Sequence, residues 1–128
     1  MKLNFSRILA NHPEIDITTD QWIVLDILFH QSPVTQQSLA EMAMKDAPTV
    51  TRILDLLELK KYIVRENFPG DRRKFNITLT RKGENMYRKV FPLARSFREV
   101  CYRGITSAEL ITFRKVLSKI QQQLHLIS

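Results

Sequence analysis

Apolar residues recur at the three- and four-residue spacing of amphipathic helices along most of this 128-residue chain. One such stretch follows a capping-box sequence at Thr18–Gln21 and predicts a helix that runs to about His30. A second predicted helix begins near its cap Thr35, and a third is capped by Asp46 or Ala47. Their expected inward faces are Trp22, Leu25, Leu28 and Phe29, then Leu39, Met42 and Ala43, then Val50, Ile53, Leu54 and Leu57.

The pattern changes to the two-residue period of a strand just after the third helix. Tyr62–Glu66 is rich in β-prone residues, and Phe75, Ile77 and Leu79 alternate with polar residues as on a strand with one buried face. The intervening Asn67–Asp71 has the composition of a turn. We therefore expect a β-hairpin directly after the helices.

Further helices are expected at both ends of the chain. A short one should span Ser6–Asn11, where His12-Pro13 would end it. A long one should begin at the cap Thr80 and be kinked by Pro92. A second capping box at Thr106–Glu109 precedes a heptad-like apolar seam. The seam consists of Leu110, Phe113, Leu117, Ile120, Leu124 and Ile127.

The order helix, short helix, turn, helix, hairpin is that of a winged helix-turn-helix. We expect a mainly α fold with a small β-hairpin wing, as one domain over residues 1–128. Residues 17–80 would form the winged helix-turn-helix core, and 1–16 and 81–128 a helical dimerisation region. A small winged core could not cover all the apolar residues of these end helices, so a homodimer is predicted, with folding back on the long helix as the alternative. The expected dimer interface is Leu3, Phe5, Ile8, Leu110, Phe113, Leu117, Ile120 and Leu124.

Charge adds the first indication of a partner. The formal net charge is +7, which is typical of nucleic-acid-binding domains but does not by itself establish that the protein binds nucleic acid. Six basic residues cluster between positions 65 and 82, against two acidic ones, as a surface that contacts phosphates requires. The basic residues are Arg65, Arg72, Arg73, Lys74, Arg81 and Lys82.

The third helix would enter the major groove of double-stranded DNA, led by its N-terminal residues Pro48, Thr49, Thr51 and Arg52. Arg52 can read guanine or clamp a phosphate. The alternative is that the two threonines are ordinary first-turn surface residues.

Two further groups are candidates for contacts with DNA. Thr35, Gln36 and Ser38 begin the preceding helix, where free amides can hold a phosphate, although Thr35 alone can simply be a cap. The hairpin tip carries Asp71, Arg72, Arg73 and Lys74. An arginine there can enter the minor groove while the aspartate holds it in place, and the alternative is an exposed ion pair.

Several classes of protein are disfavoured. The chain has one cysteine and three scattered histidines, and we expect no metal, no cofactor and no enzyme activity because no nucleophile–base set or glycine-rich phosphate loop is present. No stretch approaches the length of a membrane span, and Met1–Ala10 lacks a signal-peptide pattern, so a cytoplasmic protein is expected. Cys101 is either an oxidant sensor or, as is commoner, a small buried apolar residue.

These motifs together resemble the MarR family of bacterial regulators (multiple antibiotic resistance regulators) over about residues 18–85. The wing matches in Asp71-x-Arg73-x5-Leu79-Thr80 and Lys82-Gly83. The helices match in Thr19–Trp22 with Leu25, in Thr35-Gln36 with Leu39-Ala40, and in Lys45–Arg52. The sequence departs from the family in its short first helix and at Met44 and Lys61, where the family usually has glycine.

The resemblance implies a sequence-specific transcription regulator, expected to be a homodimeric repressor on a pseudo-palindromic operator. It also implies terminal helices at the dimer interface and release from DNA by a small-molecule or oxidant signal. The family's pocket tends to lie between the dimer helices and the winged domain, which makes His12, Trp22, His30 and Tyr87 candidate ligand contacts. The alternative function is a winged-helix protein–protein interaction module whose basic face is merely solvated.

Overall fold

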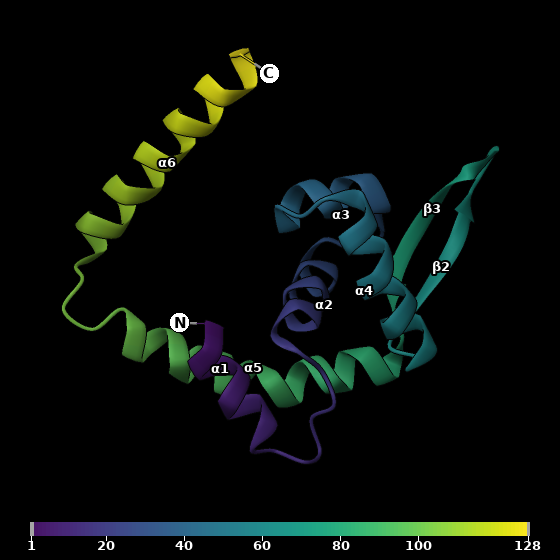
Figure 1. Cartoon of the computed structure of the whole chain (residues 1–128), viewed down its shortest axis with the longest axis horizontal. Coiled ribbons are helices and arrows are strands. Elements are labelled where there is room, and N and C mark those ends of the chain that lie inside the picture. Colours follow the sequence, from purple (N-terminus) through teal and green to yellow (C-terminus); the bar gives the residue numbers. More distant parts are fainter. Residues whose placement is uncertain (1, 128) are drawn as a thin grey trace. The chain divides into compact units, whose positions relative to one another are not determined.

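The computed structural model describes the backbone of residues 2–127, and the side chains of that range except 2, 3, 68, 71–74 and 127. The elements of this range are α1 (Lys2–Ala10), α2 (Thr19–Gln31), β1 (Val34–Thr35), α3 (Gln36–Ala43), α4 (Ala47–Leu59), β2 (Ile63–Phe68), β3 (Asp71–Leu79), α5 (Arg81–Cys101) and α6 (Ser107–Ile127) (Figure 1). They confirm a mainly helical fold with a small antiparallel sheet. The chain forms two compact units, residues 1–95 and residues 96–128.

The helix caps predicted from the sequence are present. Thr18 and Gln21 form a reciprocal capping box, in which each side chain accepts a hydrogen bond from the backbone amide of the other residue. Asp46 rather than Ala47 caps α4, and its Oδ1 accepts from the Thr49 amide at 2.8 Å. Thr35 caps α3, and Thr106 with Glu109 forms the second box. Each cap contributes about 1 kcal/mol to its helix.

The core of residues 1–95 gathers apolar side chains from α2, α3, α4, α5 and the sheet. Its largest fully buried members include Leu25, Leu28, Leu39, Leu54, Leu57, Ile63 and Ile77. Burial of each such side chain stabilises the fold by about 1.5–3 kcal/mol. The predicted inward face of α3 is wrong at Met42, which is 42% exposed because it lies in the last turn of a helix that ends at Ala43.

A three-stranded sheet of order β1-β3-β2 replaces the predicted two strands. Just before α3, Val34 and Thr35 pair with Ile77 and Asn76 of β3 as a short strand that was not predicted from the sequence. The β-branched Val34 is 7% exposed there, so burial against the sheet outweighs its place next to a helix. Thr35 both ends β1 and caps α3.

The hairpin of β2 and β3 turns more tightly than expected. Phe68 pairs with Asp71, so only Pro69 and Gly70 connect the strands, and the φ of 83° at Gly70 suits the third position of a type II turn. The expected burial of Phe75 is wrong, since it is 38% exposed. Strand β3 pairs with β1 only at residues 76 and 77. The hairpin from residue 67 to residue 75, called the wing below, extends beyond this pairing.

The remaining differences are local. Helix α1 begins at Lys2 rather than Ser6. Helix α5 contains Pro92, as expected of the long helix, and ends at Cys101. Met44 and Lys61 take the left-handed conformation that the resemblance assigns to glycine, with φ of 55° and 67°. That conformation costs a non-glycine residue about 1–2 kcal/mol. The two turns nevertheless keep the geometry expected for glycine at these positions. Among the described residues, no helix is long and apolar enough to cross a membrane.

Candidate nucleic-acid interface

The outward side of α4 is polar at its N-terminal end. Pro48 lies in the first turn, where both it and Arg52 are exposed, whereas Thr49 and Thr51 are half-buried. Hydrogen bonds from the Thr49 side chain and backbone hold the pKa of Asp46 below its ordinary value. The cap therefore stays ionised at neutral pH and occupies the Thr49 amide. Arg52 is left as the long exposed donor of this end of the helix.

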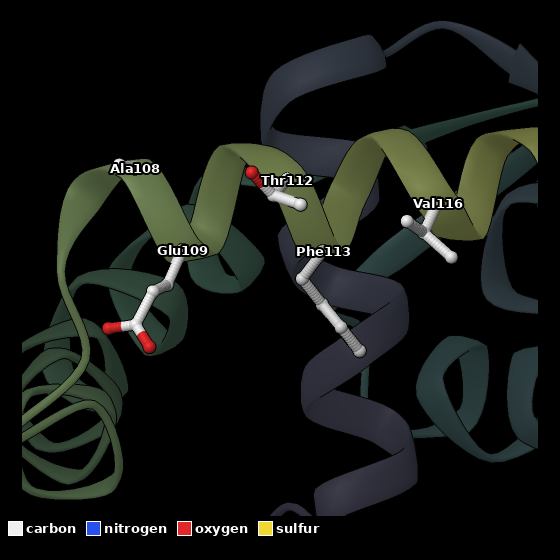
Figure 2. Close-up of a pocket in the computed structure, with 5 residues that line it drawn as sticks. All are labelled: Ala108, Glu109, Thr112, Phe113 and Val116. Carbon is white, nitrogen blue, oxygen red and sulfur yellow. The ribbon is translucent and has the colours of Figure 1, made fainter.

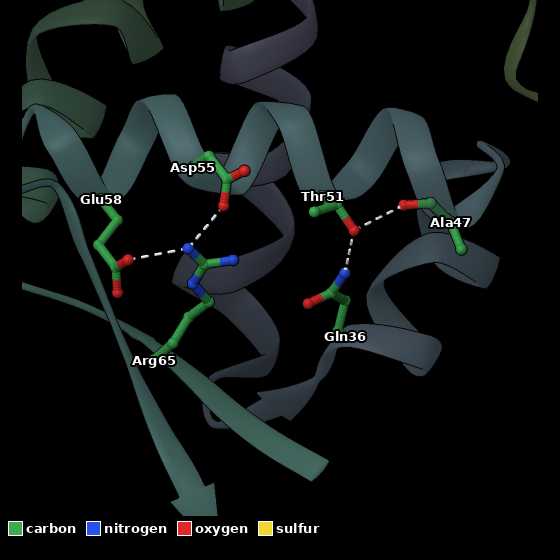
Figure 3. Close-up of polar contacts among 6 residues, drawn as sticks. All are labelled: Gln36, Ala47, Thr51, Asp55, Glu58 and Arg65. Atoms are coloured by element: carbon green, nitrogen blue, oxygen red, sulfur yellow. Dashed lines mark hydrogen bonds and ion pairs between the residues drawn. The ribbon is translucent and has the colours of Figure 1, made fainter. Parts of the chain in front are cut away.

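Thr51 does not stand alone on the surface of α4 but is bonded to α3. The Nε2 of Gln36 donates to Thr51 Oγ1 at 2.6 Å, and Thr51 Oγ1 donates in turn to the carbonyl of Ala47 at 3.0 Å (Figure 3). The single hydroxyl hydrogen of Thr51 is thereby used. Thr51 can accept a hydrogen bond or offer its methyl group to a base, but it cannot donate.

The start of α3 is organised by a similar exchange. Thr35 Oγ1 accepts from the Ser38 amide at 3.1 Å and donates to Ser38 Oγ at 3.0 Å. Because the hydrogen of Thr35 points to Ser38, Ser38 is the residue with a hydroxyl hydrogen to offer a phosphate. Of the three residues predicted here, Gln36 and Thr35 also have structural roles.

Arg65 of β2 is bound to α4 rather than presented to solvent. Its Nη2 donates to Asp55 Oδ1 at 2.7 Å and to Glu58 Oε1 at 2.8 Å (Figure 3). The hydrogen bond between Arg65 and Glu58 lowers the pKa of Glu58 and raises the pKa of Arg65. The assignment of Arg65 to a phosphate-contacting cluster is therefore wrong. An acidic pair at i, i+3 before a strand arginine was the sequence signal for this contact.

The base of the hairpin is fixed to the start of α5 by backbone contacts. The Thr80 amide donates to the carbonyl of Tyr62 at 3.0 Å, and Thr80 Oγ1 donates to the carbonyl of Lys61 at 2.7 Å. The Gly83 amide donates to Thr80 Oγ1 at 3.0 Å. A Cβ at Gly83 would lie 2.1 Å from the Tyr62 carbonyl oxygen, so only glycine fits. The Thr80–Gly83 part of the wing motif thus has a structural role.

Lys82 also belongs to this base. Its Nζ donates to the carbonyl of Lys60 at 2.9 Å and lies 5.0 Å from the centre of the Tyr62 ring. Tyr62 donates through its hydroxyl to Asp16, and burial together with Asp16 raises the pKa of that hydroxyl. The tyrosine therefore stays protonated, and it ties the segment before α2 to the base of the hairpin.

The side chains predicted at the tip of the wing, Asp71, Arg72, Arg73 and Lys74, lie outside the described residues, as does that of Leu3. Their backbone forms the start of β3, directly after the Pro69–Gly70 turn.

An aromatic cavity of about 370 Å³ lies between α2 and α5 and is lined by Phe29, His30, Tyr87, Arg88 and Phe91. Tyr87 stacks on Phe29 at 4.0 Å and on Trp22 at 5.0 Å between ring centres. Of the predicted ligand contacts, Trp22, His30 and Tyr87 are thus brought together, with Trp22 buried behind the lining. His12 lies instead just after the end of α1, where its Nδ1 is 2.8 Å from the Ile8 carbonyl oxygen.

The predicted seam on α6 is exposed. Phe113, Leu117, Ile120 and Leu124 are 42–61% exposed, and Leu110 is half-buried. An open hollow of about 460 Å³ follows one side of this helix, along which Figure 2 shows Phe113 and Val116 projecting. Phe5, also predicted at the dimer interface, is 5% exposed and belongs to the core of the single chain.

Within the part of the chain that the structure describes, no group of three histidine, cysteine or acidic side chains is close enough to hold a metal ion. Cys101 is a half-buried free thiol at the end of α5.

This architecture is similar to that of known proteins. The model of the MarR family matches residues 17–75, which include α2 to α4 and most of the hairpin. A solved protein of unknown function from Listeria innocua is 32% identical, with 94% of this chain and 82% of that chain covered and a TM-score of 0.69. The S. aureus MepR–DNA complex is 26% identical, with 95% and 88% covered and a TM-score of 0.80. Streptococcus pneumoniae FabT in complex with DNA is 25% identical, with 99% and 89% covered and a TM-score of 0.73.

Proposed function

This chain belongs to the MarR family, and from that premise we propose that it is a homodimeric repressor that binds a pseudo-palindromic operator and leaves it when a small molecule binds. At the coarser level the chain is a DNA-binding transcription regulator of the winged-helix class. The observation that carries the proposal is the exposed N-terminal end of α4, with Arg52, inside the segment that matches the family.

Each element has a role in this proposal. The N-terminal end of α4 enters the major groove, where Arg52 reads a base edge or a phosphate. Ser38 at the start of α3 donates to a phosphate, and the wing places the arginines at 72 and 73 in the minor groove. Two solved relatives of similar fold, MepR and FabT, are complexes with DNA, which supports the same use of this face.

The dimer would form through the apolar side of α6. Exposed seam residues at heptad-like spacing, Phe113, Leu117 and Ile120 among them, favour a second copy as the partner, since soluble proteins rarely leave such a stripe uncovered. Two copies would present two recognition helices, and their two-fold axis accounts for a palindromic target.

The effector would occupy the aromatic cavity between α2 and α5. About 370 Å³ suits a small organic molecule, Tyr87 and Phe29 offer ring faces, and the Arg88 guanidinium suits a negatively charged group. Because α5 leads from this cavity to the base of the wing, a molecule that moves α5 would alter the DNA-binding face.

The test is the fluorescence anisotropy of labelled duplexes at rising salt. Proteins that make 6–10 phosphate contacts lose roughly 10³–10⁵-fold in affinity between about 50 and 200 mM salt, and we expect a loss of this kind here. Arg52→Ala should weaken binding, whereas Lys89→Gln, which removes one exposed charge from α5, serves as the charge-matched control. The absence of binding at low salt would favour a protein–protein interaction module instead.

A further inference from the structure

Arg65 joins the wing strand β2 to the recognition helix α4 at a single guanidinium nitrogen. Nη2 carries two hydrogens and donates to both Asp55 Oδ1 and Glu58 Oε1, at nitrogen–oxygen distances of 2.7 Å and 2.8 Å (Figure 3). The Arg65 side chain is only 18% exposed, against 58% for Asp55 and 43% for Glu58. We call this three-residue contact the Arg65 clamp.

The position of the clamp along the hairpin is important. Arg65 pairs with Ile77, and Ile77 in turn pairs with Val34 of β1, so the clamp lies where the sheet still has three strands. Beyond Asn76 the wing continues as two strands alone. A two-stranded ribbon has little rigidity of its own, so its direction depends on how its base is held.

The length of the wing amplifies any movement at the base. The chain from Arg65 to the Pro69–Gly70 turn spans about 15 Å at roughly 3.3 Å per residue. A rotation of about 10° at the base would therefore move the tip by about 2–3 Å, which is more than a hydrogen bond can tolerate.

Electrostatics favour a positioning role over a direct contact with DNA. The clamp contains two carboxylates and one guanidinium, so its net charge is negative and it does not attract phosphates. A guanidinium with two charge-assisted bonds from one nitrogen is instead fixed in orientation.

We propose that Arg65 is a positioning residue that fixes the direction of the wing relative to α4, so that the wing and the recognition helix engage one DNA duplex together. The engagement of DNA rests on the function proposed above. The fixed direction of the wing is independent of that function, and it can be measured on the free protein.

The first test measures the direction of the wing without DNA. Spin labels at Leu59→Cys on α4 and Asn67→Cys on the wing, in a Cys101→Ser background, report the distance between the two elements; both labelled positions are exposed. We expect a narrow distance distribution that becomes at least about twofold wider in Arg65→Gln and stays narrow in the charge-matched control Lys89→Gln. An unchanged width in a folded Arg65→Gln protein would overturn the proposal.

The second test is a double-mutant cycle on a DNA duplex selected by the wild-type protein. If the clamp fixes the direction of the wing, Arg73→Ala should weaken DNA binding about tenfold in the wild-type background. The same substitution should weaken DNA binding less than threefold in the Arg65→Gln background, where that direction is no longer fixed. Losses that simply multiply would show that the two residues act independently and would contradict the proposal.

The two tests fail in distinguishable ways. If Arg73→Ala changes affinity less than twofold in the wild-type background, the wing contact of the proposed function is wrong, and the distance distributions alone decide on the clamp. Arg65→Lys gives a further check, because it keeps the charge on a shorter side chain. We expect it to restore only part of the narrow distribution, and full restoration would show that charge alone suffices.

Discussion

Replacement of Gly83 by alanine should destabilise the protein, although alanine is the better helix former. Gly83 lies in the first turn of α5, where the carbonyl of Tyr62 approaches its Cα. A Cβ there would lie 2.1 Å from that oxygen and 3.2 Å from Leu79 Cδ2, whereas carbon and carbonyl oxygen ordinarily stay about 3.3 Å or more apart. The start of α5 or the end of the Lys60–Tyr62 turn must therefore move by about 1 Å.

The backbone on both sides resists this movement. The Tyr62 amide donates to Leu57 O at 2.9 Å, the Tyr62 carbonyl accepts from the Thr80 amide at 3.0 Å, and the tyrosine side chain is 2% exposed. Overpacking costs about 1–3 kcal/mol and each strained hydrogen bond about 1 kcal/mol, against a gain in helix propensity of about 1 kcal/mol. We expect a net loss of about 2–3 kcal/mol in the free energy of unfolding.

Urea unfolding followed by the fluorescence of Trp22, the only tryptophan, measures this loss at a fixed protein concentration. Gly70→Ala is the comparison, because a Cβ at Gly70 meets nothing within 4 Å and the cost there, about 1 kcal/mol, comes from its positive φ alone. A Gly83→Ala protein as stable as the wild type, or more stable, would refute the close approach of Tyr62.

Three further predictions concern other parts of the molecule. Arg52→Ala should cost about 1–3 kcal/mol of binding to the selected duplex and relax its specificity, and an equal loss on all sequences in anisotropy titrations would identify a phosphate contact instead. Leu117→Asp should place a charge in the dimer seam, and sedimentation at micromolar concentration should then show a monomer; a variant that remains dimeric would rule out that seam. Arg65 holds the pKa of Glu58 below its ordinary value of 4.5, so the stability from this pair is present above that pH and is lost as the pH falls towards the folded pKa. The urea midpoints of wild type and Arg65→Gln should accordingly converge on acidification below about pH 4, and a constant difference would contradict the pairing.

The helices could be predicted from the sequence because their signals are local. A capping box such as Thr18–Gln21 and an apolar period of 3.6 residues need no information from distant parts of the chain. Strand β1 could not be predicted in this way, since Val34 and Thr35 form a strand only because Asn76 and Ile77, some forty residues later, offer a free edge. The exposure of Phe75 also depends on this distant pairing, because β1 is too short to pair with β3 along the wing.

The candidate site was predictable in its residue types but less so in their bonding. The outward position of Arg52 follows from helical periodicity. The pairings of Gln36 with Thr51 and of Arg65 with Asp55 and Glu58 join separate elements, so charge counts along the sequence placed Arg65 in the wrong group. Gly83 likewise matched a motif, and only the approach of Tyr62 gives the reason for it.

Selection of genomic DNA fragments by the purified wild-type protein, repeated at low and moderate salt, is the decisive measurement of whether the protein is a sequence-specific dimeric regulator. We expect the recovered fragments to share an inverted repeat with half-sites spaced by about one helical turn, and to be retained at moderate salt. Recovery of only unrelated fragments that are lost at moderate salt would contradict a sequence-specific dimeric regulator.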